Sequence, residues 1–516
     1  MKNKLFFAVA AFVGGLSLTG CSDLLDIKQH GVLNYDTYYK TSDQILSADA
    51  TMYLTLRGLE YNLLLSKNMF SDDFYAGGAG RGDNTDLEHL NEFTFDAEQD
   101  YLQSLFSSYY SIIYNANVIL GHVEDNDVPY AKMARAEAKV FRAYSFFELT
   151  SMWGNPPLVD HELAPSEYFL PNGSSEDLWG LMEKDLTEAI TSGALVEKTG
   201  LDDNVTWRVT KQYAQALLGK VYLWQGKNKE AAEQFNAVVA SKKYDLFKGG
   251  IENLTRCANK HNCESLFESN RVHDDNNAFQ NFSMYDLMIN WRMDRLNWPS
   301  DTPVMNTGWG FRVPTKNLYD AFVKHEGAGG DRLNRTIKTL EQIHDELGFS
   351  LKNTIISEGY FFWKDVPLKD ERGGSSDFVY AANILWMRYA EVLLCGAEAS
   401  LLSGDKTTAL DYVNKIRERS KLSPLSDVTL EDIKIEKRLE LCGEGQRFQD
   451  ILRWGDAAEA LKDNGKNYPL LNANGQVTYT ATGNPVYGFK KGKHERLPYP
   501  ATEIRLNENI DQNPGY

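Results

Sequence analysis

Cysteine, long apolar runs and net positive charge are all scarce in this chain of 516 residues. Only five residues are cysteine, so a dense framework of disulfides does not hold the fold together. After the first twenty residues, no apolar run is long enough to span a bilayer. The chain has 54 Lys and Arg against 72 Asp and Glu, a formal net charge of -18. This charge argues against a nucleic acid partner, because it repels phosphates.

Common catalytic motifs are also missing. The nine histidines form no HExxH motif and no paired metal spacing, and the chain has no GxSxG and no P-loop. Residues 77–83, GGAGRGD, lack the GxGxxG register and indicate a flexible loop. We therefore expect no catalytic residue, no cofactor and no metal site. A glycosidase remains an alternative, because it needs only two carboxylates across a cleft and the acidic residues are abundant.

The cysteines beyond residue 21 fall into two groups. Cys257 and Cys263 bracket a loop short enough to close as a disulfide in an oxidising compartment, and the sequence leaves that pairing open. Zinc is less favoured there, because His261 alone does not complete a set of ligands. Cys395 and Cys442 lie in apolar helical settings and are expected to be buried thiols.

Two stretches almost two hundred residues apart share one spacing. In LGKVYLWQGKNKEAAEQFNAV (218–238) and LLCGAEASLLSGDKTTALDYV (393–413), a glycine is followed by apolar residues after five and nine positions; these are Gly226, Ala231 and Phe235, and Gly404, Ala409 and Val413. This spacing is typical of tetratricopeptide repeats. The glycine serves the turn, and small residues at 219, 231, 397 and 409 let two antiparallel helices approach. Each copy predicts a helical hairpin, and such hairpins must stack to bury their apolar faces.

Helical periodicity extends over much of the chain. It predicts helices over 101–123, 131–153 and 176–190, a return to helix from 381, and a helix over 435–455. Arg447, Asp450 and Arg453 would share one face of that last helix, so their charges are expected to pair along it as part of the scaffold. Residues 242–380 hold no apolar period beyond two turns. The fold class expected is mainly α, with tetratricopeptide-like hairpins in a curved scaffold and an irregular loop-rich lobe.

The N-terminus has the pattern of a bacterial lipoprotein signal. Lys2 and Lys4 precede an apolar run that ends in Leu18-Thr19-Gly20-Cys21. This ending resembles a lipobox, in which cleavage before Cys21 leaves that residue to be acylated. Several acyl chains suffice for stable membrane anchoring.

The chain resembles the SusD/RagB family of outer-membrane lipoproteins, which bind nutrients, mostly glycans, at the cell surface. Four stretches carry the resemblance across essentially the whole mature chain. They are the lipobox at Cys21; Arg142, Trp153, Gly154 and Pro157; Arg438, Glu440, Glu444, Gly445, Arg447, Asp450, Arg453 and Trp454; and Pro500, Glu503, Ile504, Asn513, Pro514, Gly515 and Tyr516.

The resemblance implies a surface-exposed, lipid-anchored protein of the outer membrane that passes a glycan to a SusC-like TonB-dependent transporter and acts as its lid. It suggests a division into a signal peptide (1–20), an N-terminal helical region with the first hairpin (21–241), an aromatic-rich lobe (242–380) and a C-terminal region with the second hairpin (381–516). A protein-interaction scaffold without a small ligand remains a further alternative.

Exposed aromatic rings beside hydrogen-bonding groups are the expected features of a sugar-binding surface. Residues 290–312 supply Trp291, Trp298 and Trp309 in a segment whose Pro, Asp, Asn and Gly residues prevent a long amphipathic helix. One or more of these tryptophans could instead fill a small core of the lobe. Resemblance to the family also implicates an early loop at 71–83, with the candidates Asp72, Asp73, Phe74, Tyr75 and Arg81.

The lipobox gives a direct prediction. Cys21→Ala should leave the precursor without acyl chains and absent from the outer surface, because acylation needs the thiol. Protease treatment of intact cells measures this. Removal of the variant as readily as the wild type would contradict the lipoprotein assignment.

Overall fold

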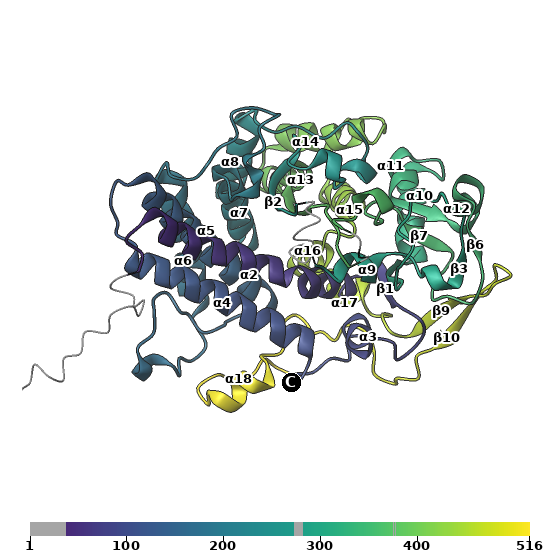
Figure 1. The fold of residues 1–516 in the computed structure, drawn as a ribbon, viewed down its shortest axis with the longest axis horizontal. Coiled ribbons are helices and arrows are strands. Elements are labelled where there is room, and N and C mark those ends of the chain that lie inside the picture. The colour runs from purple at the N-terminus through teal and green to yellow at the C-terminus, as the bar shows by residue number, and fades with distance from the viewer. Residues whose placement is uncertain (1–37, 273–281, 375, 377) are drawn as a thin grey trace, which may run out of the picture.

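The computed structural model describes residues 38–272, 282–374, 376 and 378–516, and long helices dominate it (Figure 1). The mainly helical fold class is therefore confirmed. The long helices are α2 (Ser42–Met69), α4 (Asp100–His122), α5 (Pro129–Trp153), α6 (Ser175–Thr191), α7 (Lys211–Trp224), α8 (Asn228–Ala240), α13 (Tyr389–Leu402), α14 (Lys406–Arg419) and α15 (Leu430–Leu441). Cys21 and the predicted signal peptide lie outside the described residues. None of the described helices combines the length and the apolarity needed to cross a bilayer.

Neighbouring helices in the chain are also neighbours in space. α2 packs on α4 and α5, α4 on α5, α5 on α6, α6 on α7, and α7 on α8. Helix α5 lies between α4 and α6 and is buried on nearly all sides from Ala136 to Trp153. This explains why its sequence is apolar all round rather than along one stripe.

The two hairpins predicted from their spacing are present and pack on each other. They are α7–α8 and α13–α14, and α8 packs directly on α13 although 148 residues separate the end of one from the start of the other. Gly226 (φ 71°) and Gly404 (φ 95°) make the turns in the left-handed region, as expected. The ring of Phe235 is the wedge between the hairpins. A Cβ atom added at Gly219 would lie 2.7 Å from that ring, and one at Gly396 would lie 3.1 Å from Phe235 Cβ.

The middle of the chain forms short helices and two-stranded antiparallel sheets. The helices are α9 (Tyr285–Ile289), α10 (Lys316–Glu326), α11 (Asp331–Thr336) and α12 (Leu340–Leu347). The sheets of the described chain pair β1 (Phe74–Gly77) with β4 (Phe311–Pro314), β2 (Ser265–Ser269) with β8 (Ile384–Arg388), β3 (Leu296–Asn297) with β6 (Ser350–Leu351), β5 (Ile337–Thr339) with β7 (Tyr360–Phe362), and β9 (Asn467–Leu471) with β10 (Val477–Ala481). Helix α10 has eleven residues and is longer than the two turns expected here. Only Leu318 and Phe322 are buried in it, so its sequence shows little apolar periodicity.

A second hydrophobic core, separate from that of the helices, holds this part together. It contains Trp291, Met293, Leu296, Val304, Ile343, Phe349, Ile355, Phe361, Val366 and Leu471. Leu471 belongs to β9, so the hairpin β9–β10 is part of the lobe in space although it follows α15 in sequence. Strands β3, β6, β9 and β10 lie at the end of the molecule away from α4, α5 and α6 (Figure 1).

Two sequence-based helix boundaries are wrong. Residues 384–388 form the strand β8, whose pairing with β2 overrides helical periodicity, and α13 starts only at Tyr389. The single helix expected over 435–455 is two helices, α15 and α16 (Arg447–Trp454). Gly443 (φ 81°) and Gly445 (φ 75°) make the break between them in a conformation that other residues rarely adopt. A short α17 (Ala457–Ala460) follows α16.

The end of the chain closes onto the end of α5. Trp153 Nε1 donates to the carbonyl oxygen of Pro498 at 2.9 Å, and Asn513 Nδ2 donates to the carbonyl oxygen of Trp153 at 2.7 Å. The short helices α3 (Thr85–Glu92) and α18 (Ala501–Leu506) complete the fold. The sequence motif that ends α5 and the motif that closes the chain thus form one structural unit.

The cysteines of the described chain are all free thiols. Cys257 and Cys263 do not form the disulfide that the sequence left open, and burial raises the pKa of the Cys257 thiol to about 11. Cys395 and Cys442 are buried, as expected.

The contact between Gly219 and Phe235 predicts a loss of stability on enlargement. Gly219→Ala should lower the free energy of unfolding by about 1–2 kcal/mol, because overpacking a core outweighs the gain in helix propensity. Gly180→Ala in α6 is the matched control. It adds its Cβ in open space and should raise stability by up to about 1 kcal/mol. Chemical denaturation of both variants measures the difference, and equal effects at the two positions would contradict the packing argument.

Candidate functional site

An open cleft at the end of the lobe contains two of the predicted tryptophans. We call it the aromatic cleft; it has a volume of about 620 Å³, and its lining includes Trp298, Trp309, Asn297, Asn306, Thr307, Arg292, Asp294 and Lys352. Both indoles are partly exposed, and amide, hydroxyl and charged groups surround them. This mixture of flat apolar faces and hydrogen-bonding groups is typical of small-molecule and sugar sites.

The backbone around Trp309 is fixed by one buried amide. Asn290 Nδ2 donates to the carbonyl oxygens of Met305 and Thr307, both at 2.8 Å, and Trp309 N donates to the carbonyl oxygen of Leu287. Gly308 is required, because a Cβ there would lie 2.2 Å from the carbonyl oxygen of Trp291. Gly310 has φ 70°, which also favours glycine. The role of Asn290 was not predicted from the sequence. The glycines on either side of Trp309 could have indicated a tightly fixed backbone there.

Trp298 is held from the opposite side. It follows β3, which pairs with β6, and the ammonium group of Lys369 lies 5.5 Å from its ring centroid. Arg292 bridges the two parts of the cleft, since its Nη1 donates to the carbonyl oxygen of Trp309 at 3.1 Å and its Nε lies 2.8 Å from Asp294. The cleft is therefore held by ordered contacts on both sides of the gap.

The expected exposure of Trp291 is wrong. Its side chain is 5% exposed and packs on Phe349, Phe361 and Trp363 in the second core, and its Nε1 donates to the carbonyl oxygen of Phe362 at 3.0 Å. The aromatic residues that surround it come from 58 or more positions later in the chain. Trp291 supports the lobe and offers no free face to a ligand in this structure.

The early-loop candidates lie elsewhere. Phe74 is buried against Phe362 and Arg312, and Arg81 pairs with Glu88 and Glu92 while its guanidinium lies 5.7 Å from the centroid of Tyr468. These two side chains are already engaged within the protein. Neither side chain lines the aromatic cleft.

Asp72, Phe74 and Tyr75 line a second cleft, which we call the polar cleft. Its volume is about 730 Å³, and its lining also includes Asn91, Asn317, Glu358, Arg438, Arg447, Asp456, Glu459, Lys462, Asp463, Asn464, Lys466, Asn467 and Tyr479. Of the predicted residues, Trp298 and Trp309 thus line the aromatic cleft, and Asp72, Phe74 and Tyr75 line the polar cleft. Sequence analysis missed Tyr479 and its hairpin, although Asn472 to Gly475 is a recognisable turn sequence between two runs of alternating residues.

The floor of the polar cleft is a set of buried ion pairs. Arg447 Nε donates to Asp72 Oδ1 at 2.8 Å, and Arg438 contacts Asp72 at 3.0 Å and Asp73 at 2.8 Å. Burial by itself raises the pKa of the Asp72 carboxyl, but Arg438 and Arg447 outweigh it and lower the pKa to about 2. Both carboxylates lie almost fully inside the protein, so these pairs hold the loop after α2 against α15 and α16.

The expected pairing along one helix is wrong for these charges. Arg447 pairs with Asp72, Arg453 pairs with Glu398 of α13, and Asp450 pairs with Lys437 of α15 at 2.6 Å. Only Asp450 and Arg453 meet within α16, at 3.5 Å. The break at Gly443 and Gly445 turns α16 so that its charges reach other elements.

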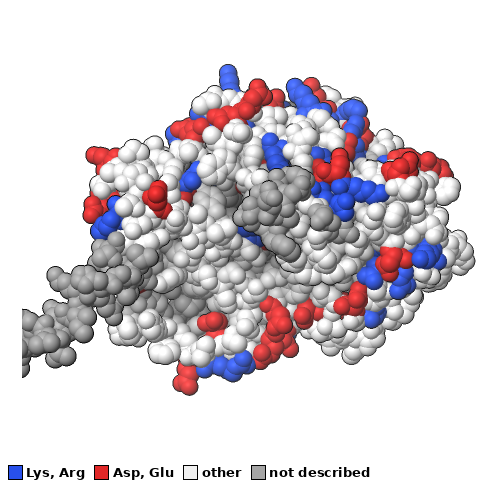
Figure 2. Space-filling view, viewed as in Figure 1, with Lys and Arg blue, Asp and Glu red and all other residues white. Residues whose placement is uncertain are grey.

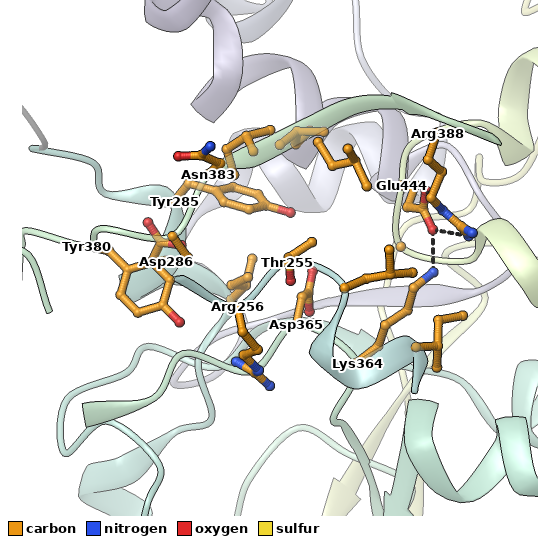
Figure 3. Close-up of a pocket in the computed structure, with 18 of the residues that line it drawn as sticks. Thr255, Arg256, Tyr285, Asp286, Lys364, Asp365, Tyr380, Asn383, Arg388 and Glu444 are labelled. Atoms are coloured by element: carbon orange, nitrogen blue, oxygen red, sulfur yellow. Dashed lines mark hydrogen bonds and ion pairs between the residues drawn. The ribbon is translucent and has the colours of Figure 1, made fainter. Parts of the chain in front are cut away.

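A third space lies inside the molecule and is too small for a sugar. It has a volume of about 70 Å³, against about 300 Å³ or more for common ligand pockets (Figure 3). Lys364 and Arg388 both point to Glu444 there, at hydrogen-bonding distance, and Asp286 pairs with Arg271. Its charges are thus used within the protein, which favours a structural role.

No group of three or more His, Cys, Asp or Glu side chains in the described ranges is arranged to hold a metal ion. On the face in Figure 2, basic and acidic side chains both occur along the margins. That face presents no continuous band of one sign.

Two family models match separate parts of the chain. The SusD family matches residues 351–516, and a family described as starch-binding associating with outer membrane matches residues 33–223. SusD-like protein P2 from Formosa agariphila is 24% identical over the full length of both chains. A SusD-like protein from Bacteroides ovatus is 25% identical over 88% of this chain and 83% of its own.

Solved structures are similar over nearly the whole chain. A laminarin-binding SusD-like protein has a TM-score of 0.77 and 29% identity, and the match covers 92% of this chain and 99% of that one. Surface glycan-binding protein A from Bacteroides fluxus has a TM-score of 0.74 and 26% identity, with 92% and 100% covered.

The buried pairs of the polar cleft predict a structural role for Arg447. Arg447→Ala should lower the free energy of unfolding by about 3 kcal/mol, because Asp72 and Asp73 then share only Arg438. Asp72 has a depressed pKa, so its contribution to stability is present above its unfolded pKa near 4 and is lost as the pH falls toward 2. Without Arg447 the folded-state pKa of Asp72 is less depressed, so the stability lost between pH 4 and pH 2 should be smaller in the variant.

Thermal unfolding between pH 2 and pH 7 measures both effects. Lys466→Ala is the control, since Lys466 lies on the rim of the same cleft with an exposed side chain, and its unfolding temperature should match the wild type. An Arg447→Ala variant as stable as Lys466→Ala at every pH would refute the role of these pairs.

Proposed function

Because this chain belongs to the SusD/RagB family, we propose that it is a lipid-anchored glycan-binding protein of the outer cell surface. In this proposal it captures an oligo- or polysaccharide and delivers it to a SusC-like TonB-dependent transporter, over which it acts as a lid. The lipobox at Cys21 supplies the anchor after removal of residues 1–20. Residues 21–241 and 381–516 form the scaffold regions, and residues 242–380 supply the lobe that carries the ligand site. The protein binds its glycan without cleaving it.

The aromatic cleft is the observation that carries this proposal. Trp298 and Trp309 come from two segments that β3 and Asn290 hold in place, and both indoles are partly exposed and line the same open space. Sugar rings have apolar faces that pack on such indoles, and their hydroxyl groups find partners in Asn297, Asn306 and Thr307. Trp291 supports the cleft from beneath rather than contacting the sugar.

Laminarin is the first ligand that we propose. A relative of known structure with 29% identity is described as laminarin binding, and its match covers 92% of this chain. Laminarin is an uncharged polymer, which suits a cleft whose charged side chains are of both signs: Arg292 and Lys352 stand beside Asp294. A neutral ligand needs no excess of one charge.

Removing either exposed indole should weaken the complex. Trp298→Ala and Trp309→Ala should each raise the Kd for laminarin by about tenfold or more, because truncating a central aromatic contact costs more than about 1 kcal/mol. Isothermal titration calorimetry with the detergent-solubilised full chain measures this. Trp207→Ala is the control, since that side chain is 46% exposed and lies beside Arg208 in the helical part of the molecule. Wild-type affinity in both cleft variants would rule out this location.

An assay for reducing ends in the same mixtures distinguishes binding from hydrolysis. We expect no reducing ends to appear when laminarin is incubated with the wild-type chain. Their appearance, and their loss on substitution of Glu358 or Asp456 in the polar cleft, would make the protein a glycosidase instead.

A further inference from the structure

We propose that the polar cleft is a second saccharide-binding surface, and that one long neutral polysaccharide chain occupies both clefts at once. This inference rests on the proposed function, but it concerns a different set of side chains. The polar cleft is of the size of a ligand site, at about 730 Å³, and the buried cavity of Figure 3 is not.

The first support is a built arrangement of tyrosines at the rim. The Tyr479 hydroxyl donates to Glu358 Oε1 at 2.5 Å, and Tyr75 also interacts with this carboxylate. Burial, together with Glu358, raises the pKa of the Tyr75 hydroxyl above its ordinary value. Lys316 N donates to the other oxygen of Glu358. The Glu358 carboxylate therefore fixes Tyr479 at the cleft, where this residue remains 54% exposed.

The second support is that the cleft carries donors and acceptors together. Asn317 accepts from Arg438 through Oδ1, and its Nδ2 donates to no described residue. Arg447 uses Nε and Nη2 for its pair with Asp72, and its Nη1 forms no hydrogen bond with the described chain. Asp456, Glu459 and Asp463 also line the cleft; each pairs with a lysine and keeps lone pairs that can accept from a hydroxyl group. A hydroxyl group donates and accepts at once, so a polyhydroxylated ligand matches this lining.

The charge of the lining selects against anionic polymers. Its acidic side chains are Asp72, Glu358, Glu431, Asp456, Glu459 and Asp463, and its basic side chains are Arg438, Arg447, Lys462 and Lys466. Asp72 and Asp73 together balance the charge of the two arginines. The remaining balance is acidic, so a neutral glycan fits this surface better than an anionic one.

The two clefts lie at opposite ends of strand β4. Trp309 precedes this strand and lines the aromatic cleft, and Thr315 follows it and lines the polar cleft. The chain from Trp309 to Thr315 advances by at most on the order of 20 Å, because Gly310 and Arg312 have positive φ, and a glycan of several sugar rings can cover this distance.

Two linked contacts give a polymer an advantage that a short oligosaccharide lacks. Once one part of the chain is bound in the aromatic cleft, the second contact becomes intramolecular and its effective concentration is high. Affinity should therefore depend on the length of the glycan. A short oligosaccharide occupies the aromatic cleft alone and gains nothing from the polar one.

The test compares laminarin with laminaritriose on the full chain. Tyr479→Ala should weaken laminarin binding by about tenfold or more and change laminaritriose binding less than about twofold. Trp298→Ala should weaken both. Tyr479→Phe should keep most of the affinity for laminarin, because it retains the ring and loses only the bond to Glu358. Tyr168→Ala, at a loop tyrosine that is 59% exposed, is the matched control and should bind as the wild type does. Unchanged unfolding temperatures confirm that each variant folds.

Each other outcome overturns a different statement. Loss of laminarin binding in Trp298→Ala but not in Tyr479→Ala leaves the proposed function intact and refutes the second contact. Wild-type binding in Trp298→Ala refutes the aromatic cleft, and no binding of laminarin by the wild type refutes both. Should Tyr479→Ala bind laminarin normally and lose association with the transporter, the polar cleft is a protein-docking surface and the inference is wrong.

Discussion

Glu440 is fully buried, and guanidinium groups from three separate elements surround its carboxylate. Arg388 at the end of β8 lies 2.6 Å away, Arg332 of α11 lies 3.2 Å away, and Arg419 of α14 also contacts it. Burial by itself raises the pKa of Glu440, but these three groups outweigh it and hold the pKa well below its usual range. A charge in such a place is tolerated only with all its partners, and loss of one costs about 3–5 kcal/mol. These buried ion pairs therefore hold the lobe and the hairpins together, in addition to the burial of apolar side chains.

Helix α15, which contains Glu440, also forms ion pairs closer to the surface. Two residues before Glu440, Arg438 leaves α15 in another direction and contacts Asp72 and Asp73. After the glycine break, α16 brings Arg447 to Asp72 as well. The loop that follows α2 is thus clamped between two arginines, and it continues directly into β1 and the paired β4. Since Trp309 lies just before β4, the interior ion pairs and the open clefts form one connected structure.

Local patterns predicted the parts of this fold that depend on neighbouring residues. The hairpins followed from glycine and alanine spacing, because the residues that make each turn and each close approach lie within twenty positions. The burial of Trp291 did not follow, because Phe349, Phe361 and Trp363 cover it from far along the chain. The partners of Arg447 and Arg453 were missed for the same reason, since Asp72 precedes Arg447 by 375 residues. The break between α15 and α16 could have been predicted from Gly443 and Gly445 themselves, but the helical periodicity of the residues on both sides concealed it.

The packing of α8 on α13 has a consequence for how such a protein can vary. The chain leaves the row of helices after Ala240 and returns at Tyr389 to the next place in the same row, so the intervening segment is topologically an insertion between two consecutive helices. Exchange of that segment leaves the order of the helices unchanged. The exchange is nevertheless constrained at a few joints: a new insert must present a carboxylate where Glu264 meets Arg419 and a guanidinium where Arg332 meets Glu436. A single scaffold can thus accept many recognition surfaces, provided that each one carries the same few charges at its base.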